Sequence, residues 1–193
     1  MSTRLVSTAT VGALMAMSAM AASQKVEIRN SAGQLVGTAV VSDKAYLLGQ
    51  QSLELLSFKF DLKGLPPGDH RVSIHVHASC DAPGFATVGD QLLQPNLPEE
   101  PASPASRPEK LEETFGDLGN ISVKADGKAK ATLEANATAV PIEFGAAPSV
   151  STALGLILRN GGASLVIDAQ PDDLRSNPDG KLGEHIACGL ILP

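Results

Sequence analysis

Aromatic residues are scarce in this chain, which has no tryptophan, one tyrosine and five phenylalanines among 193 residues. Proteins that bind single-stranded nucleic acid stack the bases on such side chains. The net charge of −6 also repels phosphate backbones and anionic lipid surfaces. After the first two dozen residues there is no apolar run long enough to span a bilayer. We therefore expect neither a nucleic-acid partner nor a membrane partner.

The N-terminal segment has the composition of a secretory signal peptide. Arg4 supplies a short basic region, residues 5–20 are apolar or small, and Ala19-Met20-Ala21 fits a cleavage site. We predict a signal peptide over residues 1–21 and one domain over residues 22–193, in a protein exported to the periplasm or secreted. The alternative is a buried N-terminal helix.

Cysteine is nearly absent, with only Cys80 and Cys188 in the chain. In an oxidising compartment two cysteines favour one disulfide, whereas two reduced and buried thiols are the alternative. A bond between these residues would close a loop of more than a hundred residues, which contributes on the order of 4–5 kcal/mol in the chain-entropy treatment. We predict that the bond forms.

Helical periodicity is weak, and short alternating segments separated by turn residues predict an all-β domain, either a sandwich or a flattened barrel. Asp126-Gly127 is a strong hairpin turn signal. Two long irregular segments, 81–115 and 169–184, interrupt the pattern, and prolines spaced by three in the first predict an extended stretch. The expected strands are 25–29, 34–41, 53–62, 71–77, 121–124, 128–133, 153–158, 164–168 and 185–192.

The pattern His75-Val76-His77 is a candidate metal site, because residues two apart in a strand point to the same face. In a β-protein, two imidazoles on one strand face near a cysteine such as Cys80 can form part of a metal site. The alternative is two neutral histidines covered by a loop.

Four sequence blocks occur in a distinctive order: LPPGDHRVSIHVHASC (65–80), FGDLGNISVKADGKA (115–129), SLVIDAQPDDL (164–174) and HIACGLI (185–191). Together they resemble the copper/zinc superoxide dismutases. The resemblance implies an eight-stranded Greek-key flattened β-barrel with two long loops covering an active site on its wall. It also implies superoxide as the substrate of an active member, and a possible homodimer.

The resemblance assigns roles to individual residues. His75 and His77 match two copper ligands, and Cys80 and Cys188 match the disulfide that ties a loop to the barrel. Three further residues have supporting roles: Asp117 matches a zinc ligand, Asp172 matches the second-shell aspartate that links the metal sites, and His70 matches a structural histidine. Four residues separate His70 from His75, where the family usually has two, so we expect an insertion of two that preserves strand parity.

The metal site departs from the family pattern in several places. Gln91 stands at the bridging histidine and Thr114 at a zinc histidine, and no histidine lies between His77 and His185 to supply the third. Zinc binding is therefore not expected. Asp168 replaces a copper histidine, and His185 replaces the arginine that attracts and orients superoxide.

The sequence thus predicts an exported superoxide dismutase-like protein with a degenerate metal site, residual copper binding and little or no dismutase activity. One alternative is an active copper-only dismutase, or another copper redox enzyme, that uses His75, His77, Asp168 and His185. In that case His185 would be both a possible ligand and the catalytic residue in place of the arginine. The second alternative is a metal-free interaction domain.

Overall fold

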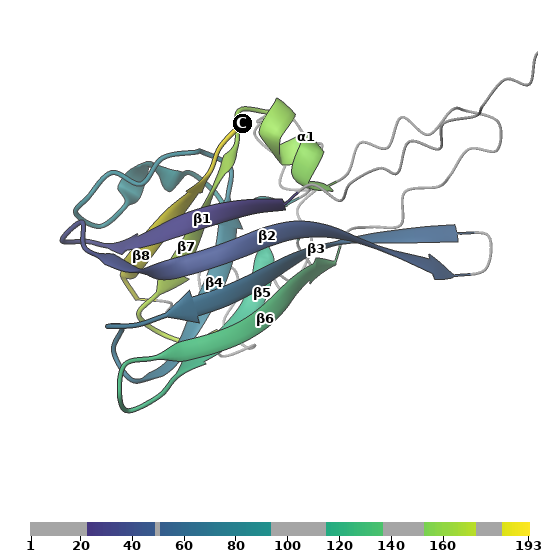
Figure 1. The fold of residues 1–193 in the computed structure, drawn as a ribbon. Coiled ribbons are helices and arrows are strands. Elements are labelled where there is room, and N and C mark those ends of the chain that lie inside the picture. The colour runs from purple at the N-terminus through teal and green to yellow at the C-terminus, as the bar shows by residue number, and fades with distance from the viewer. Residues whose placement is uncertain (1–22, 49–50, 94–114, 137–152, 173–182) are drawn as a thin grey trace, which may run out of the picture.

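The computed structural model describes residues 23–48, 51–93, 115–136, 153–172 and 183–193. Eight strands form one antiparallel sheet in the order β5-β4-β7-β8-β1-β2-β3-β6, curled into a nearly closed barrel (Figure 1). The predicted all-β barrel is confirmed. The strands are β1 Ser23–Asn30, β2 Leu35–Leu48, β3 Gln51–Leu62, β4 Gly68–His75, β5 Asp117–Val123, β6 Ala129–Asn136, β7 Ala163–Asp168 and β8 His185–Ile191. The proposed signal peptide, the proline-rich stretch and Thr114 lie outside the described residues.

Alternation of side chains explains why these segments form a barrel. In β1, Val26 and Ile28 are buried, while Lys25 and Glu27 between them are exposed. Side chains of one parity therefore fill the interior and the others face water. By contrast, every residue of β7 is buried. One face of β7 packs on the barrel core, and Val166 on the other face packs against the loop that follows β4.

The Asp126-Gly127 turn forms as predicted, but it does not join a two-stranded hairpin. Lys124 and Lys128 are hydrogen-bonded across it, with the nitrogen and oxygen 2.9 Å apart, and Gly127 adopts a φ of 74°. The flanking strands β5 and β6 then pair with β4 and β3 respectively. Because β5 and β6 are the two ends of the strand order, this turn lies where the barrel nearly closes.

The strand predicted over 153–158 is wrong, because residues Ala153–Arg159 form the helix α1. Its buried residues, Ala153, Leu154 and Ile157, follow helical spacing, and the Leu154 nitrogen donates to the Asp43 carboxylate at 2.9 Å. A short apolar run does not distinguish a strand from a buried helix by periodicity alone. Within the described ranges, no helix is long and apolar enough to cross a membrane.

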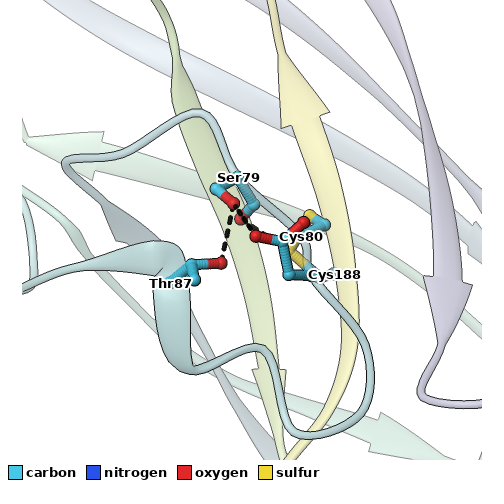
Figure 2. The surroundings of a disulfide bond; sticks show 5 residues. Ser79, Cys80, Thr87 and Cys188 are labelled. Carbon is cyan, nitrogen blue, oxygen red and sulfur yellow. Dashed lines mark hydrogen bonds between the residues drawn. A yellow bond between two sulfur atoms is a disulfide. The ribbon is translucent and has the colours of Figure 1, made fainter.

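The predicted disulfide is confirmed: Cys80 and Cys188 are bonded, with Cα atoms 5.7 Å apart and 108 positions apart in the sequence. It ties the loop after β4 to strand β8 (Figure 2). In the same loop the hydroxyl oxygens of Ser79 and Thr87 are 2.7 Å apart. Two residues in or beside the short 3-10 helix η1 (Ala86–Val88), namely Phe85 and Val88, pack against Val166 and the disulfide. This loop is therefore held both covalently and by apolar packing.

Candidate functional site

His75, the last residue of β4, is buried, and both of its ring nitrogens have partners. Its Nδ1 lies 2.7 Å from the carbonyl oxygen of Gly89, and its Nε2 lies 3.0 Å from the hydroxyl of Ser73. Since a carbonyl only accepts hydrogen bonds, Nδ1 donates, and Nε2 of the neutral ring accepts from Ser73. Burial lowers the pKa of His75 from its ordinary value. The Gly89 hydrogen bond opposes this shift, and the nearby Arg71 cation acts in the same direction as burial.

Asp168 and His185 form the second pair of the site. They end β7 and begin β8, and His185 Nδ1 donates to Asp168 Oδ1 at 2.5 Å. The Asp168 side chain is 1% exposed and its Oδ2 is buried without a hydrogen-bond partner, whereas His185 is 28% exposed. The His185 ring meets that of His75 edge to face, with centroids 5.5 Å apart. Three of the four residues suggested as metal ligands therefore lie together.

The structure places His77 differently, which corrects one prediction. Strand β4 ends at His75, so the expected strand over 71–77 is too long and the two imidazoles do not share a buried face. His77 is exposed, and its Nδ1 lies 3.2 Å from the carbonyl oxygen of Thr87. Gly89 has a φ of 74°, and a Cβ there would collide with the His77 ring. The disulfide loop thus passes close beside His77.

His70 is buried and lies in β4. Its Nδ1 is 2.9 Å from the backbone oxygen of Asp168, and its Nε2 is 2.8 Å from that of Pro66. Both nitrogens face backbone carbonyls, so neither is presented to a ligand. His70 joins β4 to the end of β7 and to the preceding turn, beside the candidate site.

A second buried polar cluster surrounds the guanidinium of Arg71. One of its terminal nitrogens, Nη2, donates to the side-chain oxygen of Gln91 at 2.6 Å and to Asp117 Oδ2 at 3.3 Å. Its Nε forms an ion pair with Asp172 Oδ2 at 3.7 Å but has no hydrogen-bond partner. The backbone nitrogen of Gly119 binds the other Asp117 oxygen at 3.0 Å. Three residues that the resemblance assigns to the bridge, the zinc site and its support therefore surround one cation.

In the described part of the chain, no three histidine, cysteine, aspartate or glutamate side chains are arranged to hold a metal ion. The unpartnered oxygen of Asp168 is the donor best placed to accept one. The His75 nitrogens, however, are both hydrogen-bonded, and Asp117 already contacts a cation. Among the residues that the structure describes, this arrangement therefore does not match a copper–zinc centre of the family type.

An antiparallel eight-stranded barrel, with a disulfide-anchored loop beside a histidine–aspartate cluster, has the architecture of a superoxide dismutase fold. The family described as copper/zinc superoxide dismutase (SODC) matches residues 36–191. This chain therefore belongs to the copper/zinc superoxide dismutase family.

Relatives and solved structures agree with this assignment. A Cu-Zn superoxide dismutase from Caulobacter vibrioides is 31% identical over 144 residues, which cover 69% of each chain. The superoxide dismutase-like protein YojM of Bacillus subtilis is 27% identical over 172 residues, covering 86% of this chain and 74% of the relative. A crystal structure of a SOD-like protein from Bacillus subtilis superposes with a TM-score of 0.60 at 27% identity, covering 87% of this chain and 97% of the other.

Sequence reasoning missed Ser73 and Arg71. Strand β4 has no bulge: it pairs with β7 continuously over Val72–His75. At the irregularity against β5, the unpaired residue is Leu118 of β5. The two-residue insertion between His70 and His75 stays a prediction, because such an insertion preserves strand parity and leaves the ladder continuous. Counting from His70 at the family spacing would have found Ser73. Nothing local in the sequence distinguishes Arg71, whose partners come from three separate segments.

Proposed function

We propose that this chain is an exported superoxide dismutase-like protein that has lost the zinc site, retains only residual copper binding and has little or no dismutase activity. The observation that carries this proposal is the pairing of the donor atoms with one another. His75 is hydrogen-bonded to Gly89 and Ser73, and Asp168 to His185. A metal at His75 Nε2 would have to displace the Ser73 bond, whereas it could reach Asp168 through Oδ2, which has no hydrogen-bond partner.

We also propose that Ser73 and His75, rather than His75 and His77, occupy the two positions that hold the paired copper histidines in the family. The spacing from His70 and the continuous β4–β7 pairing support this alignment. It leaves one imidazole, one hydroxyl and the Asp168 carboxylate where the family has three histidines. A carboxylate and a hydroxyl are hard donors, which favour Cu(II) over Cu(I), so redox cycling between the two ions is disfavoured.

Residual copper binding is expected to be weak. His77 and His185 are the imidazoles that reach solvent, while His75 and Asp168 are buried. With His185 in place of the family arginine, the permanent positive charge that would attract superoxide is also absent from this position.

The test is copper loading of residues 22–193 with one equivalent of Cu(II), followed by dialysis, metal analysis and a superoxide-removal assay. We expect well under one copper per chain and no activity above a free-copper control. His75→Ala and His185→Ala should each change what little copper signal remains. One tightly held copper per chain together with superoxide removal would instead establish the active copper enzyme. Complete absence of copper would favour the metal-free interaction domain.

A further inference from the structure

We infer that the guanidinium of Arg71 replaces the zinc ion of the family as the cation that fastens the loops to the barrel. This inference rests on the proposed loss of the zinc site. It adds that the chain supplies a substitute, on β4, for the ion it no longer binds.

The three partners of Arg71 come from three separate segments. Gln91 lies in the loop after β4, Asp117 is the first residue of β5, and Asp172 follows β7. The side chains of Arg71, Asp117 and Asp172 are 4%, 3% and 11% exposed. This is therefore a buried interaction, for which solvent screening is weak, and not a pair on the surface.

Backbone hydrogen bonds bring the segments to the guanidinium. Next to Gln91, the Leu92 nitrogen donates to Ile74 of β4 and the Leu92 oxygen accepts from Gly116, with distances of 2.8 and 2.7 Å. The loop after β7 is held by a bond of 3.1 Å from the Arg71 nitrogen to the Gln170 oxygen. Asn120 and the backbone of Asp172 exchange two further bonds, of 2.9 and 3.1 Å. The two loops thus meet on either side of one side chain.

The donor chemistry suits an organic cation better than zinc. Structural zinc sites rely on thiolate and imidazole ligands, whereas the atoms around Arg71 are two carboxylates and an amide oxygen. A guanidinium has five N–H donors in a planar fork and no acceptor, so it can bind several oxygens at once. It is charged at every physiological pH and is part of the chain, so this link needs no metal supply.

The test compares Arg71→Gln and Arg71→Lys with the matched control Arg29→Gln, which removes an exposed arginine paired with Glu27. The readout is hydrogen exchange at the Leu92 and Asp172 amides, one in each loop. The Lys63 amide, which donates to Val36 at 2.7 Å between β2 and β3, is the reference. We expect Arg71→Gln to accelerate exchange in both loops at least tenfold relative to Lys63. Arg71→Lys should restore part of the protection, and Arg29→Gln should change none of the three.

If Arg71→Gln does not fold, Asp172→Asn provides the milder test. It keeps the side-chain shape and should accelerate exchange at Ala169, whose nitrogen donates to Glu184, more than at Leu92. Equal effects at the two amides, or none at either, would overturn the inference.

A chelator arm separates this inference from the proposed function. In wild-type protein, excess EDTA and excess Zn²⁺ should both leave the exchange at Leu92 and Asp172 unchanged. Loops that loosen in EDTA would show that a metal holds them, which contradicts the loss of the zinc site as well. If neither reagent changes the exchange in wild-type protein, and the exchange in both loops stays slow in Arg71→Gln, only the role of Arg71 is refuted.

Discussion

Two buried polar clusters lie along β4, and they differ in the cation that each contains. Around Arg71, a permanent cation meets two carboxylates and an amide oxygen. Around His75, the buried carboxylate of Asp168 has one imidazole partner and one oxygen without any. Each cluster keeps one buried polar atom without a hydrogen-bond partner, Arg71 Nε in the first and Asp168 Oδ2 in the second. The first cluster, however, has a permanent cation built into the chain. Under the proposed loss of the zinc site, the arginine side of the site has a cation in place of the ion, and the His75 side has no such permanent cation.

The largest effect should come from removing the cation of the Arg71 cluster. Arg71→Gln leaves Asp117 and Asp172 buried without their partner, and such a change typically costs about 3–5 kcal/mol in the free energy of unfolding. Urea denaturation measures the loss. Arg29→Gln, at an exposed pair, should cost less than about 1 kcal/mol. Equal losses in the two variants would contradict the distinction between the buried and the surface pair.

The disulfide anchors the loop that supplies the Gly89 carbonyl to His75 and, further from Cys80, the Gln91 side chain to Arg71. The double variant Cys80→Ala/Cys188→Ala should lose about 2–5 kcal/mol in the free energy of unfolding. Hydrogen exchange should rise in the loop after Cys80 before it rises at Gly119, whose nitrogen binds Asp117 in the arginine cluster. Simultaneous loosening of both sites would show that the two clusters are not independent.

Asp168→Asn tests the cluster around His75 directly. The change removes the negative charge but leaves an amide oxygen that can accept from His185, and we expect a loss of about 1–2 kcal/mol. The loss should be smaller than that of Arg71→Gln, because one Asp168 oxygen already lacks a partner. Thermal and urea unfolding of the two variants under the same conditions give the comparison, and a larger loss at Asp168 would reverse it.

The smallest effect should be a pH dependence that comes from His75. Burial, the main cause, lowers its pKa in the folded protein below the ordinary value of 6.5, although the Gly89 bond and Asp168 oppose this. The unfolded chain therefore takes up the proton first as the pH falls, and the free energy of unfolding decreases between pH 6.5 and the lower folded-state pKa. The decrease amounts to about 1.4 kcal/mol per unit of pKa difference.

Urea denaturation between pH 5 and pH 8 checks this dependence. His75→Gln should flatten the decrease, whereas the matched control His77→Gln, at an exposed histidine, should leave it in place. A decrease of the same size in wild-type protein and in His75→Gln would assign the pH dependence to other groups.

Much of the fold could be predicted because it depends on local patterns. Alternation located most of the strands, Asp126-Gly127 located the turn, and the two cysteines allowed one bond. The two wrongly predicted elements have different causes. The apolar run at 153–158 suits either a helix or a buried strand, and the end of β4 depends on where its partners β5 and β7 stop pairing. The candidate site was predicted in part, since Asp168 and His185 do lie beside His75.

By itself the sequence determined the family, the antiparallel strand set and the disulfide, because each follows from residue types at fixed spacing along the chain. Only the tertiary structure decided which polar groups share a partner. Gln91, Asp117 and Asp172 are far apart in the sequence, and no periodicity relates them to Arg71. They meet because the barrel brings the start of β5 and two loops to one point on β4, where a buried cation requires oxygen acceptors to offset its lost hydration.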